Sequence, residues 1–244
     1  MPFFTRRHLL AATALVTLTP HVPTAQAALG MPWSPNEAYP PTGARPGPWL
    51  YFTADEAATV EAIVDRLIPA DELSPGGRDA GCAVFIDRQL TGPFGSHEWL
   101  YMQGPFSANP LPSQGIQSPY TPRQQYRLGL AALAEYCRGQ FGGKTFPQLA
   151  PADQDRVLTG LEKGDIHLSG YNGVELFSAI LANTMEGFFA DPIYGGNKDM
   201  CGWKLVGFPG TRYDYRDVIA NPNRPYTLPP ISIQGRPDWN RNAG

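Results

Sequence analysis

The stretch Thr53-Ala-Asp-Glu-Ala-Ala-Thr-Val-Glu-Ala-Ile-Val-Asp-Arg-Leu-Ile-Pro69 decides the fold class of this chain. Thr53 and Glu56 have the spacing of a capping box, which begins a helix. Apolar side chains then recur at the spacing of one helix face, at Val60, Ile63, Val64, Leu67 and Ile68. Proline cannot continue a helix, so the stretch predicts an amphipathic helix that ends just before Pro69.

Four further segments carry helical signals. A shorter helix is expected over about residues 79–90, where Cys82, Phe85, Ile86 and Leu90 share one face. Thr121-Pro122-x-Gln124 begins a third helix, which runs to Phe141. A fourth is predicted over residues 151–163, and a fifth from Asn172 to about residue 188. Since no alternating strand pattern and no internal repeat is present, we expect one mainly α domain of about five helices within residues 51–218.

Proline-rich segments flank this helical domain. Residues 28–50 and 219–244 contain too many prolines for a helix or a central strand, so we expect extended N- and C-terminal arms. Residues 92–120 form a long connection that contains Phe94, Trp99, Tyr101 and Phe106. Loops of that length are usually functional or mobile. The aromatic residues favour contact with something outside the chain over a surface insertion without a role.

The first 27 residues predict an export signal. Arg6 and Arg7 precede an apolar run that is too short to span a membrane, and Ala25-Gln26-Ala27 has the small-x-small pattern of a cleavage site. The arginine pair is typical of the twin-arginine signals of bacteria, which direct folded proteins to the periplasm. An ordinary secretory signal with a chance arginine pair is the alternative. In both cases cleavage is expected after Ala27.

Charge and cysteine content narrow the choice of partners. A formal charge of −3 and a pI near 5.8 provide no basic surface for nucleic acid.

The three cysteines, Cys82, Cys137 and Cys201, would lie in an oxidising compartment after export. One pair and a leftover thiol is one possibility, and the leftover could join another chain. Three buried free thiols are the other.

No catalytic centre can be recognised in the sequence. It contains no Cys-x-x-Cys, haem-attachment, zinc-protease or nucleophile-elbow motif, and no glycine-rich loop between a strand and a helix. Asp165-Ile166-His167 could form a carboxylate–imidazole pair, but an ordinary exposed loop is favoured. His97 and Glu98 are candidates for an unrecognised site. We therefore predict no catalytic, cofactor-binding or metal-binding residue in this chain.

Residues 191–218 combine glycines with large aromatic and basic side chains, a mixture that protein interfaces favour at their centres. We predict partner contacts at Tyr194, Asn197, Trp203, Lys204 and Phe208. Cys201 is the candidate thiol for an inter-subunit disulfide. The alternative is a well-packed structural loop that follows the fifth helix.

The same segment resembles a known family. Asp191-Pro-Ile-Tyr-Gly-Gly-Asn197, followed by Gly202-Trp203-Lys204 and Gly207-Phe208-Pro209-Gly210, is similar to gluconate 2-dehydrogenase subunit 3. That family comprises small subunits of bacterial membrane-associated flavin dehydrogenases. The helix signals Phe52-Thr-Ala-Asp-Glu56, Leu67-Ile68-Pro69 and Asp153-Gln154-Asp155 are similar as well. The resemblance covers roughly residues 50–218.

The resemblance implies a subunit without its own active site. In such complexes an FAD-binding large subunit of the glucose–methanol–choline oxidoreductase type oxidises a sugar or sugar acid. A multihaem cytochrome c subunit then passes the electrons to membrane quinone. The small subunit supports folding and export of the large one, and the heterotrimer lies at the outer face of the cytoplasmic membrane. The chain length and the 92–120 connection favour the gluconate branch.

Two other functions are compatible with the sequence. One is a free-standing exported enzyme with an unrecognised site, and the other is a periplasmic binding or scaffold module. The sequence identifies neither the substrate nor the electron acceptor.

Overall fold

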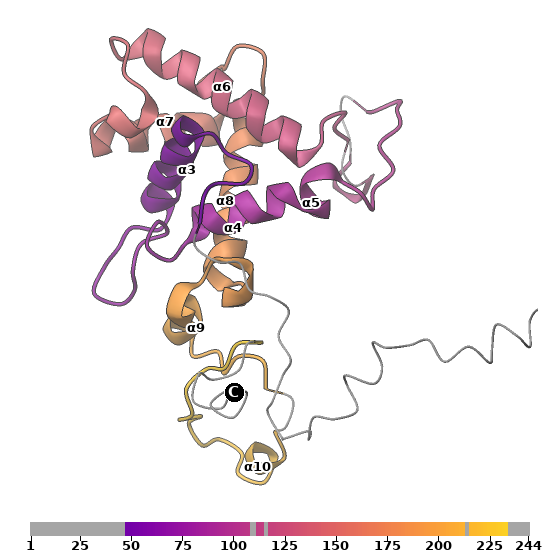
Figure 1. The fold of residues 1–244 in the computed structure, drawn as a ribbon, viewed down its shortest axis with the longest axis vertical. Helices are drawn as coiled ribbons and strands as arrows, with labels where there is room; N and C mark the ends of the chain where they lie inside the picture. Colours follow the sequence, from indigo (N-terminus) through magenta and orange to yellow (C-terminus); the bar gives the residue numbers. More distant parts are fainter. Residues whose placement is uncertain (1–46, 108–110, 115–116, 213–214, 234–244) are drawn as a thin grey trace, which may run out of the picture. The chain divides into compact units, whose positions relative to one another are not determined.

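A computed structural model describes residues 47–107, 111–114, 117–212 and 215–233 (Figure 1). The predicted signal residues Arg6, Arg7 and Ala27 lie outside the described residues, as do most of the 28–50 arm and the chain from residue 234 onwards. Within the described ranges the fold is mainly α, which confirms the predicted class. The β-bridges there are isolated ones, Leu168 to Tyr171 and Gly210 to Ile231.

The helices of ten residues or more in the described ranges coincide with the five predicted segments. They are α3 (Ala54–Leu67), α4 (Cys82–Thr91), α6 (Pro122–Gln140), α7 (Pro151–Lys163) and α8 (Gly173–Phe189). Shorter helices that the sequence did not predict are α5 (Pro93–Ser96), α9 (Cys201–Val206) and α10 (Arg216–Ile219). The 3-10 turns are η1 (Pro112–Gln114), η2 (Phe146–Gln148), η3 (Pro192–Tyr194) and η4 (Lys198–Met200).

The predicted capping interactions are present. The Glu56 amide donates to the Thr53 hydroxyl at 3.3 Å, and the Thr53 amide donates to the Glu56 carboxylate at 2.9 Å. Thr121 and Gln124 form the same reciprocal pair at the start of α6. The expected start of the second helix was wrong by three residues. Gly81 takes a left-handed conformation with φ of 82°, so α4 begins only at Cys82.

Helix α8 lies at the centre of the helical packing. It contacts α3, α4, α6 and α7, and Figure 1 shows it crossing α4 and leading towards α9. The side chains of α8 that pack into the core are Leu176, Phe177, Ile180 and Phe188. Each such buried side chain stabilises the fold by about 1.5–3 kcal/mol. No helix in the described part of the chain has both the length and the apolar character needed to cross a bilayer.

A buried carboxylate holds the chain where it enters the first helix. Asp87, on α4, accepts hydrogen bonds from the backbone amides of Leu50, Tyr51 and Phe52 at 2.9–3.0 Å. Its side chain has no exposed surface and also pairs with Arg88. Charge-assisted bonds of this kind are stronger than neutral ones. The predicted N-terminal arm is therefore fixed to the helical core at its C-terminal end.

Replacing Asp87 with alanine should destabilise the fold, because three backbone amides, one of them in a fully buried hydrogen bond, would lose their acceptor. We expect the free energy of unfolding to fall by about 2–4 kcal/mol, measured by urea denaturation. Asp153→Ala is the matched control, because the Asp153 carboxylate pairs with Arg156 on the surface of α7. The control should change the stability by about 1 kcal/mol at most. Equal effects of the two substitutions would contradict the structural role of Asp87.

Candidate protein-interaction site

The segment of residues 191–210 follows α8 and folds back against it through very close backbone contacts. A Cβ atom added to Gly196 would lie 2.2 Å from the Gly187 carbonyl oxygen, and one added to Gly202 would lie 2.1 Å from the Phe188 carbonyl oxygen. On the other side, a Cβ on Gly81 would lie 2.6 Å from the Gly195 carbonyl oxygen. Such distances exclude any side chain, so this turn can approach α4 and α8 only as glycine backbone.

Asn197 holds the turn from inside. Its side chain is completely buried, and its Nδ2 donates to the Ala190 carbonyl at 2.7 Å. Its Oδ1 accepts the Gly202 amide at 2.8 Å. Asn197, Asp199 and Met200 all have positive φ angles, between 46° and 57°. Such conformations are costly for residues other than glycine. The side-chain bonds of Asn197 and the Lys198 amide bond to the Ala80 carbonyl therefore stabilise a strained turn.

Trp203 closes the segment against α8. Its indole Nε1 donates to the Phe189 carbonyl at 2.7 Å, and only 5% of its surface is exposed. The Phe208 ring packs edge-on against it, with ring centroids 5.1 Å apart. Burying an indole with its N–H satisfied contributes both apolar contact and a directed bond. Helix α9 is thereby fixed in orientation, with Trp203 on its inner side.

Asp191 joins the segment to the C-terminal part of the chain. Its buried carboxylate accepts the Ile193 amide at 3.0 Å and the Ile233 amide at 2.7 Å. The Thr211 amide donates to the Ile231 carbonyl at 2.8 Å, beside the bridge between Gly210 and Ile231. The C-terminal arm is thus tied to the same loop as α9. The bond between Asp191 and Ile233 could not be found from sequence, because nothing in the pattern relates positions 42 residues apart.

The predicted contact residues divide into two groups. Asn197 and Trp203 are buried and bond to the chain itself, so in this structure they position the loop. Tyr194 and Phe208 are 45% and 44% exposed, and Lys204 is exposed as well. We keep the prediction of partner contact for these three side chains.

Two exposed apolar residues were missed by the sequence analysis. Leu205 and Val206, the last residues of α9, are 42% and 60% exposed. Their exposure could have been predicted from helix geometry. If Trp203 lies on the inner side of a one-turn helix, the residues that follow it face outward. We call the set Tyr194, Lys204, Leu205, Val206 and Phe208 the α9 surface. Its exposed apolar residues and charged rim are typical of protein interfaces.

The cysteine residues are free thiols in this chain. Cys82 and Cys137 are buried, and Cys201 is half-buried at the start of α9. Burial raises the pKa of the Cys201 thiol, and it raises the pKa of Cys82 to about 12, with a further contribution from Cys201 nearby. Few thiolates are present at neutral pH, so these thiols are weak nucleophiles. The inter-subunit disulfide at Cys201 stays a prediction.

His97 and Glu98 do not form an acid–base pair. The His97 side chain is 8% exposed, and its Nδ1 lies 3.2 Å from the sulfur of Met102. Burial lowers the pKa of the imidazole. Since His97 has a left-handed conformation with φ of 52°, it ends α5 and turns the chain into the long connection. Its local role is therefore structural.

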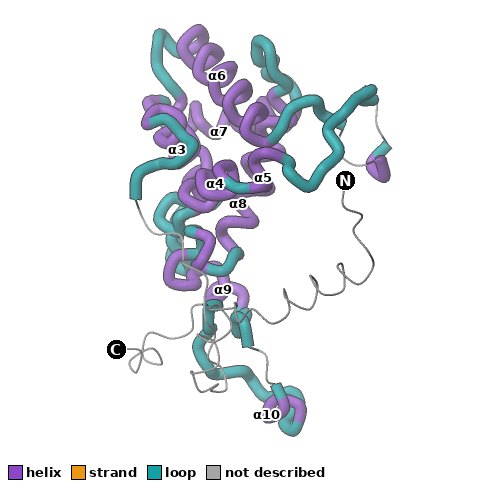
Figure 2. The backbone as a smooth tube through the Cα atoms, turned by 45° about the vertical axis from the view of Figure 1, so that its right-hand side comes forward, coloured by secondary structure: helices purple, strands orange, loops and turns teal. Residues whose placement is uncertain are grey.

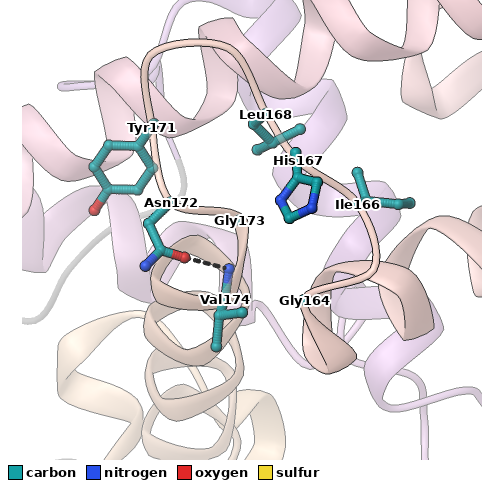
Figure 3. Close-up of a pocket in the computed structure, with 8 residues that line it drawn as sticks. All are labelled: Gly164, Ile166, His167, Leu168, Tyr171, Asn172, Gly173 and Val174. Carbon is teal, nitrogen blue, oxygen red and sulfur yellow. Dashed lines mark hydrogen bonds between the residues drawn. The ribbon is translucent and has the colours of Figure 1, made fainter.

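A pocket near the start of α8 contains the other candidate imidazole (Figure 3). It has a volume of about 300 Å³ and is lined by Gly164, Ile166, His167, Leu168, Tyr171, Asn172, Gly173 and Val174. Figure 3 shows the Tyr171 hydroxyl directed away from His167. None of the lining residues is a serine, a cysteine or a carboxylate. The pocket therefore offers no nucleophile to His167, and the described residues include no group of side chains suited to hold a metal ion.

Comparison with known proteins identifies one family. The family model for gluconate 2-dehydrogenase subunit 3 matches residues 54–210, more than half of the chain. The match begins at the first residue of α3 and ends with the glycine that pairs with Ile231. It therefore spans the helical core and the whole 191–210 loop. No curated protein and no solved structure matches the chain.

Alanine at either close-contact glycine of the loop should destabilise the protein. Gly196→Ala and Gly202→Ala would each force backbone apart, which we expect to lower the free energy of unfolding by about 2–3 kcal/mol in urea denaturation. Gly139→Ala is the control, because a Cβ at Gly139 in α6 would meet nothing within 4 Å. The control should be neutral or stabilising by up to about 1 kcal/mol. A loop that accepts alanine at both positions without loss would contradict the close packing.

Acidification should lower the free energy of unfolding through protonation of His97. The folded state lowers the pKa of this imidazole below its ordinary value, so protons bind the unfolded state more readily. Stability should therefore fall as the pH drops below about 6.5 and towards the lower, folded-state pKa. The variant His97→Asn removes the titrating group, and asparagine readily adopts the left-handed conformation of this position. Urea denaturation between pH 7.5 and 5 should show a steeper loss for wild type than for the variant; parallel curves would contradict the assignment.

Proposed function

Because the chain belongs to the gluconate 2-dehydrogenase subunit 3 family, we propose that it is the non-catalytic small subunit of an FAD-dependent dehydrogenase complex. The substrate we propose is gluconate, which the complex would oxidise to 2-ketogluconate. The observation that supports this most is the placement of the family's motif. Its glycines and Asn197 build a rigid turn, and that turn presents the α9 surface outward.

We propose that the two redox cofactors belong to the partners. FAD would lie in a large subunit of the glucose–methanol–choline oxidoreductase type, and haem c in a multihaem cytochrome subunit. The sequence contains neither a haem-attachment motif nor a glycine-rich nucleotide loop between a strand and a helix, which supports this division. In this arrangement oxidation of gluconate would release two electrons and two protons; the FAD of the large subunit would supply the electron acceptor, and the haem of the cytochrome subunit would supply the onward electron transfer.

The contact with the large subunit is proposed at the α9 surface. Tyr194, Val206 and Phe208 supply apolar area, and Lys204 supplies a charge at the rim. The backbone beneath them is already fixed, so association would cost little loop ordering. Cys201 is the least buried of the three cysteines and is therefore the candidate for a disulfide to the partner.

Export in the folded state is part of the same proposal. A twin-arginine signal at Arg6 and Arg7, with cleavage after Ala27, would carry a preassembled pair of subunits to the periplasm. The small subunit would support folding of the large subunit in the cytoplasm and supply its signal. The mature complex would lie at the outer face of the cytoplasmic membrane.

Placing a charge in the α9 surface should release the large subunit. Val206→Asp places a carboxylate at a position that is 60% exposed, so the stability of the free chain should be unaffected. Burial of an unpaired charge in an interface is costly, and we expect co-purifying flavin to fall about tenfold or more. The measurement is a pull-down from native membranes through a C-terminal tag, with flavin and haem absorbance and dye reduction by gluconate as readouts.

Leu128→Asp is the control for this experiment. Leu128 is 39% exposed on α6, outside the α9 surface, and its substitution should leave flavin recovery unchanged. Trp203→Ala is less informative, because it would leave a cavity inside the loop and disturb the fold as well as the contact. A colourless chain recovered from cells that express all subunits would contradict the proposed function. Equal flavin recovery with Val206→Asp and with wild type would contradict only the assignment of the large-subunit contact to the α9 surface.

A further inference from the structure

A second exposed apolar surface lies on α5 and on the loop that follows it. Phe94, Trp99, Leu100 and Tyr101 are 40%, 82%, 47% and 81% exposed. We call these four residues the aromatic turn. Figure 2 shows the loop after α5 in teal, extending away from α4 and α8. Such a concentration of large exposed apolar side chains indicates contact with something outside the chain.

The base of the aromatic turn is firmly held. His97 is buried against Met102, and its carbonyl accepts the Leu100 amide at 2.9 Å. The Arg123 guanidinium donates to the carbonyls of Leu90, Thr91 and Gly92, which end α4 and lead into α5. Because the backbone below is bonded in this way, the aromatic rings are presented outward by a fixed turn.

Charge distinguishes the aromatic turn from the α9 surface. From Gln89 to Pro122 the sequence contains one charged residue, Glu98, and no lysine or arginine. The α9 surface, by contrast, has Lys204 within it and lies beside a hollow of about 520 Å³ that Lys198 and Asp199 help to line. Protein interfaces normally have a polar, charged rim around the apolar centre. Beside the aromatic turn the stretch from residue 89 to 122 supplies only the exposed carboxylate of Glu98, and no cation.

Tryptophan and tyrosine have a specific affinity for the boundary between lipid headgroups and acyl chains. Their rings are apolar, while the indole N–H and the phenol hydroxyl can bond to water or headgroups. Trp99 and Tyr101 flank Leu100, so two interfacial side chains lie beside one purely apolar side chain. A turn of this composition, without lysine or arginine, matches a zwitterionic membrane surface, where no basic residue is needed for attraction.

We propose that the aromatic turn is a lipid-contact site, which inserts Trp99, Leu100 and Tyr101 into the interface of a zwitterionic bilayer. The contact is peripheral: the rings reach the boundary region, and the backbone stays outside it. It would bring the chain to a membrane independently of any partner subunit. The α9 surface, on a different segment, would remain available for protein contact.

The test uses the purified full chain and vesicles of phosphatidylcholine that contain acyl chains brominated at shallow depth. Bromine quenches tryptophan fluorescence only at close range, so the readout reports the depth of Trp99. We expect clear quenching in wild type and loss of most of it in Trp99→Phe. In vesicle sedimentation, Trp99→Ser with Tyr101→Ser should lower the partition coefficient about tenfold, because two aromatic rings no longer bury their surface. Added salt should leave binding of wild type unchanged.

The control is Leu205→Ser with Val206→Ser, which removes exposed apolar area from the α9 surface and should not affect partitioning. All variants retain the same N-terminal residues, so any lipid affinity of the apolar run after Arg7 cancels in the comparison. Unquenched Trp99, or equal partitioning of the Trp99/Tyr101 variant and wild type, would overturn the proposal. The proposal would also be overturned if wild type did not bind vesicles while the Trp99/Tyr101 variant lost its co-purifying flavin, because the turn would then contact a protein partner. Since the vesicle assay contains no partner, its failure is distinguishable from failure of the proposed subunit function.

Discussion

Direct backbone contact between the 195–202 turn and helices α4 and α8 is the constraint on which the rest of the candidate site depends. Gly196 and Gly202 lie so close to carbonyl oxygens of α8 that no side chain could be accommodated. The buried amide of Asn197 then supplies both the donor and the acceptor that the strained turn requires. Because the turn is fixed, Trp203 packs inward, and Val206 and Phe208 are left exposed. A rigid surface on a small helical protein follows from these contacts.

Two buried carboxylates connect the helical core to the ends of the described chain. Asp87 accepts three successive amides at residues 50–52, and Asp191 accepts the amide of Ile233. Each carboxylate accepts hydrogen bonds from backbone amides. Both therefore contribute to structure, since they determine where the proline-rich arms leave the core.

The sequence was sufficient to predict the helices that have both a cap and an apolar stripe. Thr53 and Thr121 begin α3 and α6 as expected, because capping boxes and helical periodicity are local signals. Helices α5, α9 and α10 were missed, since four or six residues are too few to show a period. The start of α4 was misplaced because Gly81, in a left-handed conformation, directly precedes the helix.

The candidate site was only partly predictable, for a physical reason. Asparagine and tryptophan are frequent both in interface centres and in the packed interior of loops, so their identity alone does not reveal which way they face. The structure separates the two roles: Asn197 and Trp203 satisfy the chain's own carbonyls, whereas Tyr194 and Phe208 remain half-exposed. Similarly, His97 has the chemistry of a catalytic residue, but its surroundings make it part of the support for the aromatic turn.

The central claim is that the chain presents a preformed loop to a dehydrogenase subunit. Hydrogen exchange followed by mass spectrometry, on the free chain and on the complex from native membranes, tests it most directly. In the free chain, residues 195–202 should exchange slowly, because the Lys198 and Gly202 amides are already bonded. In the complex, residues 203–208 should slow further. Rapid exchange of 195–202 in the free chain, or unchanged exchange of 203–208 on assembly, would contradict the claim.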